Sequence, residues 1–164
     1  VGHVASFREI EVFDIRPMAT RIPGVAFKQA DFMHAEDLFA GGTYCDSLSC
    51  LHALEHFGLG RYGDAIDSKG FERGLANLGR LLKPNGVLYL SVPIGSERVE
   101  FNGNRVLDPR TVIQLASRSS LTLQRLTAIR HDGATSQTVN AALLADLAVQ
   151  RYTLALFEFT KIAS

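Results

Sequence analysis

The stretch Leu81-Leu-Lys-Pro-Asn-Gly-Val-Leu-Tyr-Leu-Ser-Val-Pro93 decides the fold of this chain. It joins two kinds of secondary structure, because Lys83-Pro-Asn-Gly86 is a sequence that stops a helix and an apolar run follows it. Val87–Val92 is too hydrophobic for a strand at the edge of a sheet, so we expect a central strand with parallel neighbours. The preceding segment, Ser68–Leu82, carries apolar residues at helical spacing and predicts an amphipathic helix.

Shorter apolar runs lie upstream of this helix. We expect strands at Ile10–Ile15, Val25–Gln29 and Tyr44–Leu51, bounded by turns and irregular loops. A helix is expected to end within Val1–Phe7, and Asp31–Phe39 has the pattern of a loop with a short helical turn. Strands that alternate with crossover segments imply a parallel sheet.

Downstream of Pro93 the sequence predicts a polar, turn-like segment, two helices and two alternating strands. The last two strands are suited to antiparallel pairing as an edge hairpin. The whole chain, residues 1–164, is expected to form a single α/β domain. The downstream segments are Glu97–Asp108, Pro109–Ser117, Leu121–Arg130, Val139–Val149 and Arg151–Ile162.

The composition is that of an ordinary globular domain, with 46% hydrophobic and 21% charged residues among 164. Lys+Arg and Asp+Glu both number 17 and no basic run occurs, so we expect no nucleic-acid partner. No apolar run approaches the roughly 20 residues of a membrane span, and no signal peptide is visible. Cys45 and Cys50 fall on opposite faces of one predicted strand, which disfavours a mutual disulfide and favours buried thiols in a cytoplasmic protein.

Two of the predicted strands deliver a carboxylate to their carboxyl ends. Asp14 lies at the end of the first strand, and Asp31 follows the second. Open α/β sheets bind ligands outside the carboxyl ends of their strands, and a carboxylate offers two oxygens to a vicinal diol. The pattern therefore predicts a nucleotide-like, adenosyl cofactor. The alternatives are a surface acid at Asp14 and a cap of the short helical turn at Asp31. Arg16 is placed either to pair with Asp14 or to reach an anionic group.

The order of elements and four stretches of sequence resemble the class I S-adenosylmethionine-dependent methyltransferases. That resemblance implies a Rossmann-like α/β fold with a mostly parallel sheet. The stretches are Phe13-Asp-Ile15, Gln29-Ala-Asp-Phe-Met33, Tyr44–His56 and Leu81–Pro93.

A narrower resemblance points to a little-characterised, methyltransferase-like family of unknown function with nematode and bacterial members. In the superfamily, a first strand and a glycine-containing turn precede the position of Val1 and hold the methionine part of the cofactor. Both are absent from this sequence, through truncation or through true loss. The narrower resemblance rests on Asp14-Ile-Arg-Pro17, Leu51–Asp64 and Ser91-Val-Pro-Ile-Gly95.

The resemblance implies S-adenosyl-L-methionine as the cofactor. Asp14, with Ile15 beside it, would hold the ribose hydroxyls, and Asp31 would accept from the adenine amino group. Phe32 and Met33 would either flank the adenine ring or pack in the core, and Leu51 would lie at the end of the next strand of the site.

The segment His52-Ala-Leu-Glu-His56 supplies the expected catalytic residues, His52, Glu55 and His56. In the methyltransferase interpretation they lie beside the transferable methyl group, where a histidine can accept a proton from the acceptor. Glu55 and His56 could instead be structural, with hydrogen bonds to the glycine-rich loop. The pattern H-x-x-E-H also occurs in zinc hydrolases. We predict no metal, because the segment directly follows a strand, glycines follow it, and no distal acidic ligand is evident.

The acceptor is expected to be a small molecule or a sugar. Tyr62, within the polar loop of Arg61, Tyr62 and Asp64, is placed to cover it. The alternative to an enzyme is a catalytically inactive methyltransferase-like domain that serves binding or assembly. The sequence carries no signal for the oligomeric state of the protein. Three further residues, which follow the fifth strand of the family's order, are expected either to line the acceptor pocket or to belong to a solvated loop: Glu100, Asn102 and Arg105.

Overall fold

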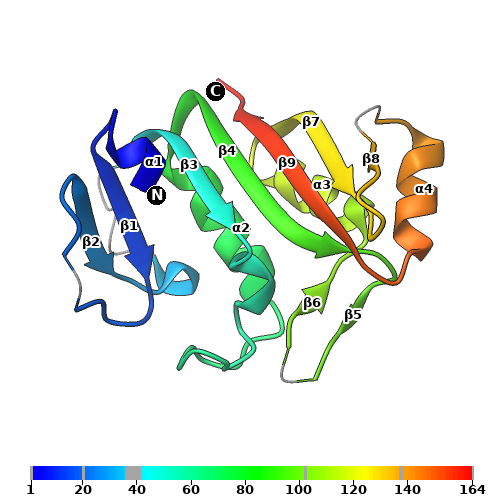
Figure 1. Cartoon of the computed structure of the whole chain (residues 1–164), viewed down its shortest axis with the longest axis horizontal. Coiled ribbons are helices and arrows are strands. Elements are labelled where there is room, and N and C mark those ends of the chain that lie inside the picture. The colour runs from blue at the N-terminus through cyan, green and yellow to red at the C-terminus, as the bar shows by residue number, and fades with distance from the viewer. Residues whose placement is uncertain (1, 20, 36–41, 102, 137–138, 164) are drawn as a thin grey trace.

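The computed structural model describes residues 2–19, 21–35, 42–101, 103–136 and 139–163 (Figure 1). The helices and strands follow the order predicted from the sequence, with three additional short strands. The elements are α1 (Gly2–Ala5), β1 (Ile10–Asp14), β2 (Val25–Gln29), the 3-10 turn η1 (Phe32–His34), β3 (Cys45–Leu51), the 3-10 turn η2 (Leu54–His56), α2 (Gly70–Leu81), β4 (Leu82–Ile94), β5 (Arg98–Val99), β6 (Arg105–Val106), α3 (Pro109–Arg118), β7 (Leu121–Ile129), β8 (Thr135–Ser136), α4 (Ala141–Val149) and β9 (Thr153–Lys161).

Five strands form the main sheet, in the spatial order β3-β4-β9-β7-β8 (Figure 1). β3 runs parallel to β4, whereas β9 is antiparallel to both of its neighbours, β4 and β7. The apolar run Val87–Val92 therefore lies in the interior of the sheet, as its composition predicts. It has a parallel neighbour on one side only, which corrects the expectation that both neighbours are parallel.

The helix-stopping turn lies between α2 and the regular part of β4. α2 ends at Leu81, and the pairing with β3 then jumps from Leu82 to Val87. Asn85 has a φ of +64°, a left-handed conformation that asparagine adopts more readily than most residues. The predicted end of the helix is thus confirmed, and the turn is accommodated as an irregularity at the start of the strand.

The last two long strands correct another expectation. β7 and β9 pair antiparallel as predicted, but they do not form a hairpin at the edge of the sheet, because β9 lies between β4 and β7. This position gives β9 a hydrogen-bonded neighbour on each side. Alternate residues of β9 enter the core, and the rings of Phe157 and Phe159 stack with centroids 5.6 Å apart.

The segment Glu97–Asp108 is more ordered than its polar composition indicates. It holds the two-stranded hairpin β5–β6, in which Arg98 pairs with Val106 and Val99 with Arg105. Both residues of β6 are buried. The local pattern missed this hairpin because each strand has only two residues.

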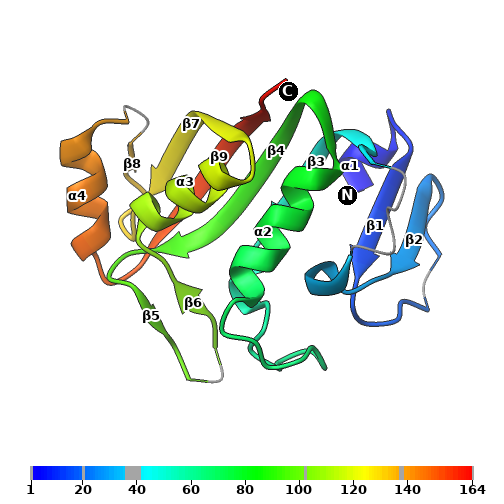
Figure 2. The same ribbon diagram turned by 180° about the vertical axis from the view of Figure 1, so that it is seen from behind.

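α2 and α3 cover one face of the main sheet (Figure 2). α2 presents Phe71, Leu75 and Leu78 at helical spacing, and all three are buried. The amino end of α2 also packs directly on the glycine-rich loop, since a Cβ at Gly70 would lie 2.7 Å from the backbone nitrogen of Gly58. This backbone contact sets the position of the loop beside the carboxyl end of β3.

β1 and β2 form a separate parallel pair, with Ile10 opposite Val25. Within the described residues they share no backbone ladder with the main sheet. Side chains join the two parts instead, because Asn77 of α2 donates a buried hydrogen bond of 2.7 Å to the carbonyl of Phe32. Phe32 in turn meets Phe13 of β1 edge to face at 5.3 Å.

No helix within the described ranges is long and apolar enough to cross a membrane. Cys45 and Cys50 are both free thiols, as their spacing predicts. Burial raises the pKa of Cys50 to about 12, so this thiol stays protonated at neutral pH.

Candidate functional site

The predicted site residues come from the carboxyl ends of β1, β2 and β3. These ends lie at the same edge of the molecule, the lower edge in Figure 1. Asp14 is the last residue of β1, and Asp31 follows β2 by two positions. His52 directly follows β3. The two acids at the ends of the β1–β2 pair and the histidine at the end of β3 therefore lie on the same side of the molecule, the side on which open α/β sheets bind their ligands.

His52 is held by its backbone and by its ring. Its φ of +51° lies in the left-handed region, and its N–H donates to the carbonyl of Ser91 at 3.0 Å. The ring Nδ1 lies 3.0 Å from Oε1 of Glu55. A carboxylate oxygen accepts, so the ring donates from Nδ1 and Nε2 stays outside this contact. The His52 side chain is 45% exposed, while that of Glu55 is only 2% exposed. A buried carboxylate thus orients an accessible imidazole.

His56 faces the same carboxylate from the other side. Its Nδ1 donates to the carbonyl of Gly103 at 2.9 Å, and its Nε2 lies 3.9 Å from Oε1 of Glu55. The second oxygen of Glu55, Oε2, is buried and has no hydrogen-bond partner among the described residues. Glu55 therefore has unused acceptor capacity between two imidazole rings.

The geometry departs from that of a helical zinc motif. η2 begins at Leu54, so His52 and His56 do not share the face of one helix. Nδ1 of each ring is already bonded, to Glu55 in one case and to Gly103 in the other. The described part of the chain contains no group of three His, Cys, Asp or Glu side chains that could hold a metal ion.

Asp14 pairs with Arg16, which is one of the two alternatives left open for that arginine. Oδ1 accepts from the backbone N–H and from Nε of Arg16 at 2.9 and 3.0 Å, and Oδ2 accepts from a terminal nitrogen at 2.8 Å. The hydrogen bonds and charge of Arg16 lower the pKa of Asp14, despite an opposing effect of partial burial. Arg16 thereby fills three of the about four lone-pair positions of the carboxylate.

Asp31 caps η1, because its Oδ1 accepts from the backbone N–H of Met33 at 2.9 Å. Its other oxygen has no hydrogen-bond partner among the described residues. Phe32 is buried in the core against Phe13, so its ring is engaged in packing. Leu51, by contrast, is 56% exposed at the end of β3, and Ile15 is half-buried.

A carboxylate that sequence analysis placed only in a polar loop organises residues 58–64. Asp64 accepts backbone hydrogen bonds from Gly58 at 2.8 Å and from Gly60 and Tyr62 at 3.1 Å. Burial alone would raise the pKa of Asp64, but these N–H donors lower it below its usual value. The signal for this role was the run of glycines that ends in an aspartate, a composition typical of tight side-chain-capped turns.

The four predicted acceptor residues fall in different places. Tyr62 lies in the site, because its ring meets that of His56 edge to face at 5.4 Å. Arg105 points inward, and its guanidinium donates to the carbonyls of Phe57 and Asp67. Burial lowers the pKa of Arg105. Glu100 accepts a 2.7 Å hydrogen bond from Arg98, and Asn102 lies outside the described residues.

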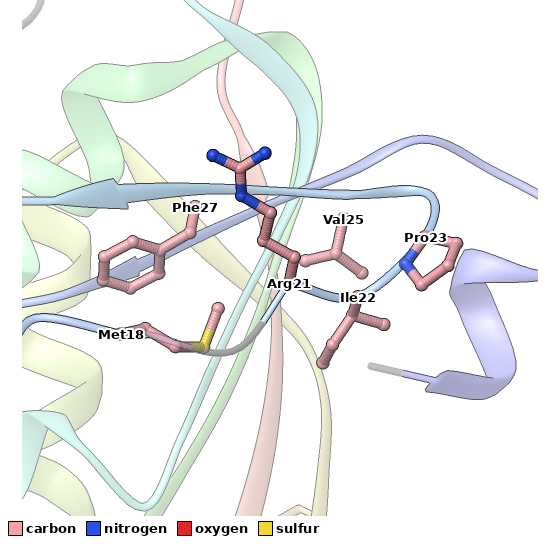
Figure 3. Close-up of a pocket in the computed structure, with 6 residues that line it drawn as sticks. All are labelled: Met18, Arg21, Ile22, Pro23, Val25 and Phe27. Atoms are coloured by element: carbon pink, nitrogen blue, oxygen red, sulfur yellow. The ribbon is translucent and has the colours of Figure 1, made fainter.

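A surface hollow of about 510 Å³ lies along β2 (Figure 3). None of the predicted site residues lines it. It is therefore separate from the cluster around His52. Its lining consists of Met18, Arg21, Ile22, Pro23, Val25 and Phe27.

Several solved structures share this fold. The [4+2]-cyclase SpnF superposes with a TM-score of 0.65 at 13% identity, over 99% of this chain and 71% of that chain. The Burkholderia thailandensis 1,6-didemethyltoxoflavin-N1-methyltransferase, solved with S-adenosylhomocysteine, gives 0.60 at 13% identity, over 94% and 62%. The N-methyltransferase NodS of Bradyrhizobium japonicum, also solved with S-adenosylhomocysteine, gives 0.55 at 17% identity, over 92% and 65%. At these identities the likeness confirms the expected methyltransferase-like fold.

No curated protein matches this sequence. A family described as "Caenorhabditis protein of unknown function, DUF268" matches residues 21–144, which is most of the chain. This match confirms the narrower resemblance seen in the sequence. The chain belongs to that family of unknown function, built on a methyltransferase-like fold.

Proposed function

We propose that this protein is an S-adenosylmethionine-dependent methyltransferase that acts on a small-molecule or sugar acceptor. The observation that carries the proposal is the accessible ring of His52, held by buried Glu55 on the side of the molecule where Asp14 and Asp31 also follow their strands. An imidazole oriented by a carboxylate is an arrangement that enzymes use to take a proton from a reacting group.

Two acids at this edge fit the cofactor. Asp31 has an oxygen available for the adenine amino group, since only Oδ1 is used as a cap. Asp14 fits the ribose if Arg16 gives way, because two hydroxyl donors need more than the one lone-pair position that Arg16 leaves. Ile15 and Leu51 supply apolar surface beside these acids, and Phe32 would contribute chiefly through its backbone.

S-adenosylmethionine, when bound, supplies a sulfonium methyl group that an acceptor oxygen or nitrogen can attack. His52 takes the proton of the acceptor on Nε2, and Glu55 stabilises the imidazolium that results. His56, fixed by Gly103, lines the same pocket and orients Tyr62. The protein otherwise acts by positioning the two reactants.

A second candidate is a methyltransferase-like binding domain without catalysis. The engagement of Asp14 by Arg16 favours it, because the carboxylate proposed for the ribose is already neutralised. One of the structural neighbours is described as a cyclase, which illustrates that this fold does not determine the reaction.

The test is calorimetric titration of S-adenosylmethionine and S-adenosylhomocysteine into the longest expressed form that contains residues 1–164. We expect saturable binding that Asp14→Asn weakens by roughly tenfold or more, since hydrogen bonds to a charged group contribute about 1.5–3 kcal/mol. Asp46→Asn is the matched control, because Asp46 is an exposed acid that pairs with Lys83. Absence of binding, or equal weakening by both variants, would overturn the enzyme proposal.

A further inference from the structure

Two guanidinium groups lie close to the ring of Tyr62. The Arg16 guanidinium carbon is 4.7 Å from the centre of the Tyr62 ring, and that of Arg61 is 5.6 Å from it. Both distances are within the range of cation–π attraction. Two positive charges thus share one aromatic platform, although they come from β1's carboxyl end and from the glycine-rich loop.

This platform adjoins the proposed catalytic residues. His56 meets the Tyr62 ring at 5.4 Å, and the carbonyl of Gly103 accepts hydrogen bonds from both His56 and Arg61. Arg61 is therefore held on the same carbonyl as His56, which itself faces Glu55. Arg61 is thus connected to the His52–Glu55 pair through Gly103 and His56.

We infer that Arg16 and Arg61, on the Tyr62 platform, form an oxyanion subsite, and that the acceptor is a small molecule carrying a carboxylate or a phosphate. This inference rests on the proposed function, because it names the acceptor class for that same site. Arg16 is ion-paired with Asp14 in this structure, and a ligand that draws it away from Asp14 leaves two uncompensated guanidinium groups beside one ring, whose charge an oxyanion then balances. A guanidinium can serve a backbone carbonyl and an oxyanion at once, because it carries five N–H donors.

The hydrogen bonds of Asp14 give the subsite an order of binding. Arg16 fills three of the about four acceptor positions of Asp14, and a ribose diol needs two of them. Ribose binding must therefore displace at least one Arg16 hydrogen bond. The released donor is already stacked on Tyr62 and becomes available to the oxyanion. Cofactor binding should thus strengthen oxyanion binding, and by linkage the reverse also holds.

The experiment is a titration of the protein with inorganic phosphate, and separately with malonate, followed through the backbone amide NMR signals of Tyr62 and Gly103. It is run with and without saturating S-adenosylhomocysteine, on the wild type, Arg61→Gln, Arg16→Gln and the control Arg118→Gln. Arg118 is an exposed arginine in the last turn of α3. The preferred probe distinguishes a phosphate-bearing acceptor from a carboxylate-bearing one.

We expect saturable shifts that Arg61→Gln weakens about fivefold or more and that Arg118→Gln leaves unchanged. S-adenosylhomocysteine should raise the oxyanion affinity about fivefold or more, a coupling typical of linked sites, and Arg16→Gln should remove that gain. The inference is overturned if neither probe shifts these signals, or if all three variants respond like the wild type. If S-adenosylhomocysteine binds but leaves oxyanion affinity unchanged, the order of binding is wrong while the proposed function stands. If it does not bind but phosphate binds through Arg61, the subsite stands and the proposed function fails.

Discussion

The carboxyl end of β1 and the amino end of α3 carry the same local motif with different consequences. Asp14-Ile-Arg16 and Asp108-Pro-Arg110 each fold so that the aspartate accepts from the backbone N–H and the guanidinium two residues later. Asp108 is the N-cap of α3, which gives its carboxylate a structural role. Asp14 has no helix to cap, and its side chain is 36% exposed against 19% for Asp108.

The difference shows that a carboxylate whose oxygens all accept hydrogen bonds does not always hold the fold together. Asp108 cannot exchange its partners without loss of a helix cap, whereas Asp14 can exchange Arg16 for a ligand at little structural cost. The end of β3 supplies what both motifs lack, an accessible base on a buried carboxylate. The following predictions separate three roles: the proposed cofactor binding at the end of β1, the proposed proton transfer at the end of β3, and the helix capping at α3.

The largest expected effect is at the end of β3. His52→Gln should lower the rate of methyl transfer by about 10²- to 10⁴-fold, the usual contribution of a general base. Its affinity for S-adenosylhomocysteine should stay within twofold of wild type, because the cofactor is assigned to the acids. The measurement is S-adenosylhomocysteine formation with an acceptor found by screening small oxyanions. His34→Gln, at the end of η1, is the control, and equal rates for the two variants would refute the role of His52.

The next largest effect is on the free energy of unfolding, which should differ between substitutions of the aspartate in the two Asp-x-Arg motifs. Asp108→Ala should lower the free energy of unfolding by about 1–2 kcal/mol, because it removes the N-cap of α3. Asp14→Ala should change it by less than about 0.5 kcal/mol, as exposed surface substitutions do. Urea unfolding of both variants measures the difference. A larger loss for Asp14→Ala would mean that the β1 motif is structural after all.

Arg16→Gln should tighten the binding of S-adenosylhomocysteine about two- to tenfold. The variant removes a competitor for the oxygens of Asp14, and a net hydrogen bond contributes about 0.5–1.5 kcal/mol. Arg110→Gln should leave this affinity unchanged, since its partner is the cap of α3. Calorimetry of the two variants tests the comparison, and weaker binding by Arg16→Gln would show that this arginine helps to hold the cofactor.

The smallest expected effect is on how the free energy of unfolding falls as the pH is lowered, which is the acid limb of the plot of stability against pH. Arginine hydrogen bonds lower the pKa of both Asp14 and Asp108, so each pair stabilises the fold above the unfolded pKa of about 3.9. That contribution is lost as pH falls through the lower folded pKa. Unfolding measured between pH 5 and 2 should show a shallower acid limb for Asp108→Ala than for wild type. A limb of unchanged slope would contradict the assigned pKa shift of Asp108.

Sequence analysis located most elements, because their signals are local. The strand patterns, the helix face of α2 and the stop at Lys83–Gly86 each depend on residues a few positions apart. The same is true of Asp14, Asp31 and His52, whose positions follow from where the strands end. The hairpin β5–β6 escaped notice because two-residue strands have no periodicity to read.

The sequence by itself determined the order of the elements, the acids at the strand ends and the family. Only the tertiary structure decided that β9 lies between β4 and β7, that Arg105 turns inward to Phe57, and that Arg16 meets Tyr62. The physical reason is that these outcomes depend on contacts between residues far apart in the chain, whose free energies no local pattern contains.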